Sequence, residues 1–337
     1  MDASNFRPQG MISNSDVSGT DEVTPTSRGD VLLPPCLMAG DRVRLVSPAS
    51  TPSKEGVHQF ARILESWGLR VELGEHVFSQ VGYLAGTDEE RLADVDDALR
   101  DEGVRAIFAT RGGRGSYRIA DRLDFRAAAA NPKFVVGFSD ITALHLALFR
   151  ACLLVGIHGA ISSWNATTVN QESVDRLRSA LMTTDPILVQ SDLSEPTSTL
   201  TTCGQAVGRL IGGNLDTLSI CAGWALPILD GCIFIIEAIG MGLGQVDRQL
   251  TMLMKAGHLR GIQGIAVGQF TDFDAVANGW SILDVLRDHF SRMRVPVLGG
   301  LPIGHGVNAK TIPIGTYAIL DADAGTLQVA AGARSRS

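Results

Sequence analysis

The sequence predicts an α/β protein of two domains, on two observations. Short apolar segments alternate with amphipathic segments of helical period over the first half of the chain, which is typical of a parallel sheet covered by helices on both faces. The chain has 337 residues, which exceeds one average domain. We therefore expect an N-terminal parallel-sheet α/β domain, a smaller C-terminal α/β domain with mixed strands, and a functional site at their interface.

The domain boundaries follow from shifts in composition. Residues 1–35 are rich in Ser, Thr, Asp, Gly and Pro and are expected to form a flexible tail, with no secretory signal. The N-terminal domain is predicted over 36–166 and the C-terminal domain over 205–332. The polar segment 167–204 is predicted to be a linker with a short helix.

In the N-terminal domain, strands and helices are expected to alternate. The predicted strands are 41–50, 69–77, 104–110, 134–138 and an apolar run within 151–160, and the predicted helices are 54–68, 86–103, 116–125 and the segment that follows Ser139. Ligands bind at the carboxyl ends of the strands in such sheets. Four loops are expected to gather at that edge: 47–50, 111–115, 139–140 and 158–159.

The C-terminal domain is predicted to open with a strand, a glycine turn and a helix capped near Asn214. The further predicted elements are a buried strand ending in Glu237, a helix over 245–257, a strand over 262–270, a helix over 281–290 and a hairpin over 317–330.

Composition excludes several classes of protein. The formal charge is −7 without a basic run, so nucleic acid is not an expected partner. No apolar run is long enough to cross a bilayer, so no membrane is expected either. The five cysteines lie mostly in apolar runs and form no C-x-x-C pair, which is typical of reduced core residues in a cytoplasmic protein.

The segment from Phe134 to Phe149 contains the first candidate for chemistry. An apolar run, Phe134 to Phe138, is followed by Ser139 and Asp140 and then by apolar residues at helical spacing. Ser139 is therefore expected at a tight strand-to-helix turn, the position of a nucleophile, with the Asp140 N–H beside it. The alternative is that Ser139 and Asp140 only cap the helix.

A hydroxyl nucleophile needs a base and a group that orients the base. Of the seven histidines, His158 and His305 lie at ends of apolar strands beside glycine, and His305 is the better candidate because its loop can reach across a cleft. His145 is expected in the core. Glu237 ends an apolar strand, where a carboxylate needs a partner. It could orient the imidazole, or it could pair with Arg248 or Lys255.

The loop R-G-G-R-G, Arg111 to Gly115, can turn backbone N–H groups toward an anion and could form an oxyanion hole with the Asp140 N–H. Arg111 and Arg114 could bind a carboxylate in a fork, although surface solvation explains them as well. The loop matches neither nucleotide-phosphate motif, and no H-E-x-x-H or C-x-x-C indicates a catalytic metal. No cofactor and no metal are expected.

Four motifs, separated along the chain, indicate a protein family when they are taken together. They are G-F-S-D around Ser139, R-G-G-x-G from Arg111, a strand ending in Glu237 with Asp247 and Arg248 ten residues on, and G-H…T-I-P-I-G around His305. Together they resemble the LD-carboxypeptidase family of serine peptidases, over residues 35–331.

The resemblance implies Ser139 as nucleophile, His305 as base and Glu237 as orienting acid, with an oxyanion hole from the N–H groups of Asp140 and Gly113. It also implies a homodimer and a small peptide substrate, a murein tetrapeptide that loses its terminal D-alanine from an L-centre during cell-wall recycling in the cytoplasm. Two departures from the family pattern, Arg114 after R-G-G and Ala238 after Glu237, border the expected cleft and bear on the substrate.

Three alternatives stay open from the sequence. An immunity-type amidase would hydrolyse an aminoacyl or peptidyl nucleotide antibiotic on the same residues. A non-catalytic peptide-binding protein could use the same scaffold, and a metal hydrolase is the third alternative.

Overall fold

A computed structural model describes residues 30–159, 170–273 and 279–336. Most of the predicted tail therefore lies outside the described residues. The last residues of the predicted tail pair with the folded chain. The Leu32 N–H donates to the Leu153 carbonyl over 2.9 Å, and Pro35 forms an isolated β-bridge with Arg334.

The N-terminal lobe is built on a sheet with six described strands. In sheet order they are β11 (Ile312–Ile314), β5 (Gly156–His158), β4 (Phe134–Gly137), β3 (Val104–Ala109), β1 (Arg42–Val46) and β2 (Arg70–Leu73). All neighbours are parallel except β11, which is antiparallel to β5. The helices of this part of the chain are α1 (Lys54–Ser66), α2 (Asp88–Arg100), α3 (Phe125–Ala130), α4 (Thr142–Cys152) and α5 (Gln171–Met182).

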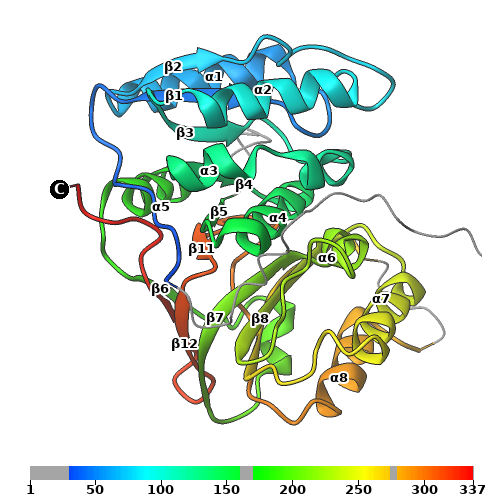
Figure 1. The fold of residues 1–337 in the computed structure, drawn as a ribbon. Coiled ribbons are helices and arrows are strands. Elements are labelled where there is room, and N and C mark those ends of the chain that lie inside the picture. The colour runs from blue at the N-terminus through cyan, green and yellow to red at the C-terminus, as the bar shows by residue number, and fades with distance from the viewer. Residues whose placement is uncertain (1–29, 160–169, 274–278, 337) are drawn as a thin grey trace, which may run out of the picture.

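The C-terminal lobe has a mixed sheet with seven described strands. In sheet order they are β10 (Val297–Leu298), β9 (Gly264–Thr271), β8 (Cys232–Ile239), β7 (Gln205–Asn214), β12 (Tyr317–Asp321), β13 (Thr326–Val329) and β6 (Ile187–Gln190). The helices α6 (Leu215–Cys221), α7 (Leu243–Lys255) and α8 (Ile282–Ser291) lie along one side of it (Figure 1). The predicted fold class is confirmed, and so is the hairpin, which is β12–β13.

Two segments occupy places that the sequence did not indicate. Within the segment predicted to be a linker, β6 pairs with β13 as the edge strand of the second sheet. Within the C-terminal part of the chain, β11 pairs with β5 and so extends the first sheet, where it lies next to the N-terminal strands (Figure 1). The chain therefore crosses between the lobes more than once.

One predicted helix is wrong. Instead of a helix over 116–125, the chain forms two short 3₁₀ turns, Ser116–Arg118 and Ala120–Arg122, and α3 begins only at Phe125. The cause is Asp124, whose carboxylate accepts a hydrogen bond from the Ala127 N–H over 2.9 Å and caps a new helix. In addition, β8 continues two residues beyond Glu237, so this carboxylate lies inside the strand rather than at its end.

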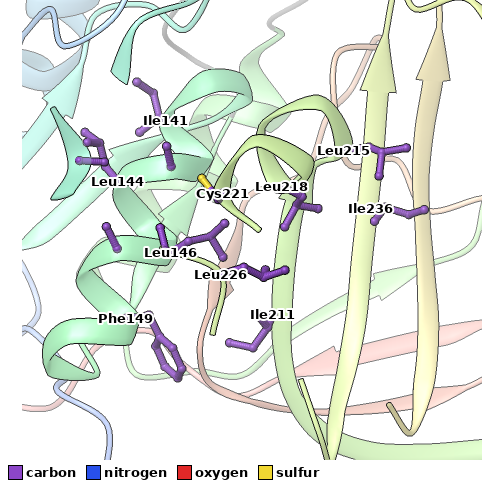
Figure 2. Packing of buried hydrophobic residues seen from close by; sticks show 14 of the residues in the cluster. Ile141, Leu144, Leu146, Phe149, Ile211, Leu215, Leu218, Cys221, Leu226 and Ile236 are labelled. Atoms are coloured by element: carbon purple, nitrogen blue, oxygen red, sulfur yellow. The ribbon is translucent and has the colours of Figure 1, made fainter. Parts of the chain in front are cut away.

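A continuous apolar core joins the two lobes next to the predicted site. Leu146 of α4 lies beside Cys221 of α6 and Leu226 (Figure 2), and Ile211 of β7 belongs to the same cluster. All four side chains are at most 2% exposed. Because α4 follows Ser139 directly, and β7 and β8 carry Asn214 and Glu237, this packing fixes the serine turn relative to the buried carboxylate.

Candidate active site

Ser139 lies at the turn between β4 and α4, as predicted, and its backbone is in the left-handed region with φ of 61°. For a residue other than glycine this conformation costs about 1–2 kcal/mol. The neighbouring chain makes room for it, because a Cβ on Gly112 would lie 2.8 Å from the Ser139 Cβ. Strain of this kind concentrates at functional sites, and Ser139 lines a cavity.

Glu237 and His305 form a close pair from distant parts of the chain. His305 Nδ1 lies 2.6 Å from Glu237 Oε2, and the Asn214 side-chain amide donates to Glu237 Oε1 over 3.1 Å. Glu237 is completely buried. Burial alone would raise the pKa of its carboxyl, but the contact with His305 and the Asn214 hydrogen bond outweigh that effect and lower the pKa. The pairing with Arg248 or Lys255 that the sequence left open does not occur.

The loop that carries His305 is fixed by Gln269 of β9. The Gly306 N–H donates to Gln269 Oε1 over 2.8 Å, and Gln269 Nε2 donates to the Val307 carbonyl over 3.2 Å and to Glu195 Oε1 over 2.6 Å. The Phe138 ring packs against the imidazole of His305 with a centroid distance of 4.8 Å. No local pattern in the sequence indicates this role for Gln269, because its partners are remote along the chain.

Ser139 and His305 line one cavity of about 330 Å³ between the lobes. Its other lining residues come from the glycine loop and the turn after it, the serine turn, the end of β7, helix α6 and the end of β8. They are Arg111, Gly112, Gly113, Arg114, Tyr117, Phe138, Asp140, Asn214, Asp216, Thr217, Ile220 and Ile239. The structure therefore brings together all of the residues that the sequence singled out for chemistry, except that Glu237 lies behind His305, out of contact with the cavity.

The glycine loop is attached to the neighbouring loop through Ser50. The Ser50 N–H donates to the Gly112 carbonyl over 3.2 Å, and Ser50 Oγ accepts from the Arg114 N–H over 3.1 Å. Gly113 has φ of 102°, and a Cβ there would lie 2.4 Å from Ser50 Oγ. Only glycine fits at this position.

The cavity carries charges of both signs. Arg111 and Arg114 are exposed at its edge, and Arg111 Nη1 also donates to the Thr51 carbonyl over 3.1 Å. Asp216, which the sequence analysis did not single out, lies on α6 and accepts hydrogen bonds from the side chains of Gln245 and Gln249, over 3.0 and 2.6 Å.

The other histidines lie outside the cavity. His158 is buried, its Nε2 has no partner among the described residues, and burial lowers its pKa to about 4. His145 is buried in α4, with its Nε2 3.1 Å from the Val135 carbonyl oxygen. His289 pairs with Asp247 over 2.8 Å.

Within the described residues, no group of three or more His, Cys, Asp or Glu side chains could hold a metal ion. In the same part of the chain, no helix has the length and apolar character required to span a bilayer. All five cysteines are free thiols, and Cys203 is exposed rather than in the core.

Comparison with known proteins assigns the family. Residues 43–159 match the model of the LD-carboxypeptidase N-terminal domain, and residues 207–320 match that of the LD-carboxypeptidase C-terminal domain. The chain belongs to the LD-carboxypeptidase family.

Among its relatives, the probable murein peptide carboxypeptidase of Bacillus subtilis is 35% identical, over 89% of this chain and 94% of that protein. The murein tetrapeptide carboxypeptidase of Pseudomonas aeruginosa is 33% identical, over 83% and 93%. The microcin C7 self-immunity protein MccF of Escherichia coli is 26% identical, over 87% and 94%. The crystal structure of muramoyltetrapeptide carboxypeptidase from Oxalobacter formigenes superposes with a TM-score of 0.76 at 26% identity, covering 88% of this chain and 100% of that chain.

Proposed function

We propose that this protein is a cytoplasmic serine carboxypeptidase that releases the terminal D-alanine of a murein tetrapeptide by hydrolysing the amide bond from an L-centre. The observation that carries the proposal is the 2.6 Å contact between buried Glu237 and His305, beside a strained serine that lines the same cavity as His305. The substrate is supported by relatives named for murein peptides.

In the proposed mechanism, His305 Nδ1–H donates to Glu237, which leaves Nε2 free to accept the Ser139 proton. The Ser139 oxygen attacks the scissile carbonyl carbon, and the resulting imidazolium is stabilised by the Glu237 carboxylate. His305 then gives the proton to the leaving amine of D-alanine. A water molecule, activated by the same imidazole, hydrolyses the acyl-enzyme and restores Ser139.

The negative charge that develops on the carbonyl oxygen needs donors. The backbone N–H groups of Asp140 and Gly113 are proposed to supply them, since both residues line the same cavity as Ser139. Arg111 and Arg114 are proposed to bind the terminal carboxylate of the peptide, because guanidinium groups pair well with carboxylates. No metal or other cofactor takes part in this mechanism.

A homodimer is also part of the proposal. Leu188, Gln328, Ile319 and Val207 stand in one row across the strands β6, β13, β12 and β7. Three of them are large apolar residues that are 45–61% exposed. Apolar rows of this kind often mark interaction surfaces. Light scattering of the purified protein tests this part, and a monomer at all concentrations contradicts it.

The function is tested by incubating the protein with a murein tetrapeptide and, separately, with an aminoacyl sulfamoyl adenylate, and following the products by mass. We expect D-alanine release that persists in excess chelator and disappears in Ser139→Ala. Hydrolysis of the adenylate alone would favour the immunity-type amidase. Activity that is lost in chelator and restored by zinc would favour a metal hydrolase. Binding of the murein tetrapeptide without turnover would favour a non-catalytic peptide-binding protein.

A further inference from the structure

The side chain of Asp140 makes an unusual contact for a residue at the start of a helix. Instead of capping its own helix, its carboxylate accepts a hydrogen bond from the Ser116 N–H over 2.7 Å. The hydroxyl of Ser116 donates in turn to the Asp140 carbonyl over 2.5 Å. Asp140 is 4% exposed and Ser116 is completely buried, so water does not compete for either bond.

These two bonds join the two segments that carry the proposed oxyanion donors. Ser116 follows the glycine loop directly, three residues after Gly113, and Asp140 follows the nucleophile Ser139. Arg91 of α2 also holds this loop, because its guanidinium donates to the Gly115 carbonyl over 2.7 Å. These contacts therefore tie the end of the glycine loop that carries Gly113 to the turn that carries the Asp140 N–H.

We propose that the Asp140 side chain is a positioning residue: through its bonds with Ser116, it sets the separation of the Gly113 and Asp140 N–H groups so that both fit the oxyanion of the transition state. This inference rests on the proposed function, and it gives the Asp140 side chain a role distinct from that of its backbone. A misplacement of about 1 Å in such a site can lower the rate by about 10²-fold.

The charges around Asp140 agree with this role. Burial raises the pKa of its carboxyl to about 6, while the Ser116 bonds and the Arg91 guanidinium act in the opposite direction. The other titratable groups near it are Asp216 and Cys221 of α6 and Tyr117 after the glycine loop. At pH 8 the carboxylate is ionised, and a charged acceptor makes the shorter and stronger hydrogen bond.

The test compares four variants at pH 8. Asp140→Leu removes the acceptor at similar volume, and Asp140→Asn keeps an oxygen acceptor without the charge. Ser116→Ala removes only the bond to the Asp140 carbonyl. The matched control is Asp94→Leu, because Asp94 is also a buried carboxylate that accepts a backbone N–H, that of His76, but lies outside the cavity.

For each variant, kcat and KM for D-alanine release are measured, together with the inhibition constant of a peptide boronic acid, which forms a tetrahedral anion on a serine. We expect Asp140→Leu to lower kcat about 100-fold and to weaken the boronic acid about equally, with KM within threefold of wild type. Asp140→Asn should recover most of the kcat that Asp140→Leu loses, and Ser116→Ala should lower kcat about tenfold. Asp94→Leu should keep the kcat of the wild type.

Several results overturn the proposal. They are an Asp140→Leu protein with kcat within threefold of wild type, a loss confined to KM, an Asp140→Asn protein no better than the leucine variant, or an equal loss of kcat in Asp94→Leu. If Asp140→Leu does not fold, the kcat values of Asp140→Asn and Ser116→Ala test the positioning role instead, and unchanged kcat in both variants contradicts it. A wild-type protein without D-alanine release contradicts the proposed function instead. In that case the rate at which a fluorophosphonate labels Ser139, which needs the same donors, decides on Asp140.

Discussion

Replacing Glu237 by glutamine tests how much of the proposed chemistry depends on one buried charge. The substitution keeps the size of the side chain and a hydrogen-bonding oxygen for Asn214, so the packing inside β8 is preserved. It removes the negative charge that lies 2.6 Å from His305 Nδ1. The amide NH₂ can also donate to Nδ1, which would place the ring proton on Nε2, where the serine proton must be accepted.

The magnitude follows from the geometry of the pair. Two unit charges about 4 Å apart attract by about 4 kcal/mol at an effective dielectric constant of 20. That attraction stabilises the imidazolium, which exists only after Ser139 has lost its proton. Its loss corresponds to roughly 10³-fold in rate, and the wrong tautomer adds to it. We therefore expect kcat to fall by on the order of 10³–10⁴-fold, with KM little changed.

The assay is D-alanine release from murein tetrapeptide under saturating substrate, for wild type, Glu237→Gln and the control Glu72→Gln. Glu72 pairs with Arg42 and Arg44 on the surface of the first sheet, so its variant should match wild type. The reasoning is refuted if Glu237→Gln keeps kcat within tenfold of wild type, or if the control loses as much activity.

Three further predictions concern positions around the site. Gln269→Ala should lower kcat by about 10–100-fold with a smaller effect on KM, because Gly306, next to the proposed base, loses the side chain that fixes its N–H; steady-state kinetics measures this. Ser139→Gly should raise the free energy of unfolding by about 1 kcal/mol relative to Ser139→Ala, because glycine adopts φ of 61° without strain; equal stability of the two variants in urea would speak against strain. The free energy of unfolding of the wild type should fall in acid because of His158. The pKa of His158 is about 4 in the folded protein, below the unfolded value of 6.5, so the stability that neutral His158 contributes is complete above pH 6.5 and is lost as the pH falls toward 4. The loss amounts to about 2–3 kcal/mol at pH 4.5. Urea denaturation of His158→Asn at pH 7.5 and 4.5 should show a loss smaller by that amount, and an identical loss would contradict it.

The sequence located the residues whose signal is local. Ser139 follows a short apolar run and precedes residues at helical spacing, and the structure places it at that turn. Glu237 is a carboxylate within an apolar strand, where an unpaired charge is costly, and its partner proved to be His305. The alternation of strands and helices was sufficient for the fold class.

Contacts between segments that are distant along the chain have no local sequence pattern from which they could be predicted. Gln269 and the bond between Asp140 and Ser116 depend on side chains that meet only after both lobes have folded. The strand β11 is three residues long, and nothing in its sequence shows that it leaves its own lobe to pair with β5. The helix predicted over 116–125 failed because the capping tendency of Asp124 outweighed the helical period.

Reaction with a fluorophosphonate, followed by mass analysis of the protein and its peptides, tests the central claim most directly. The claim predicts a single adduct on the oxygen of Ser139, complete loss of D-alanine release in the labelled protein, no adduct in Ser139→Ala, and labelling slowed at least 100-fold in His305→Gln. An adduct on another residue, or a fully labelled Ser139 in a protein that still releases D-alanine, would contradict it.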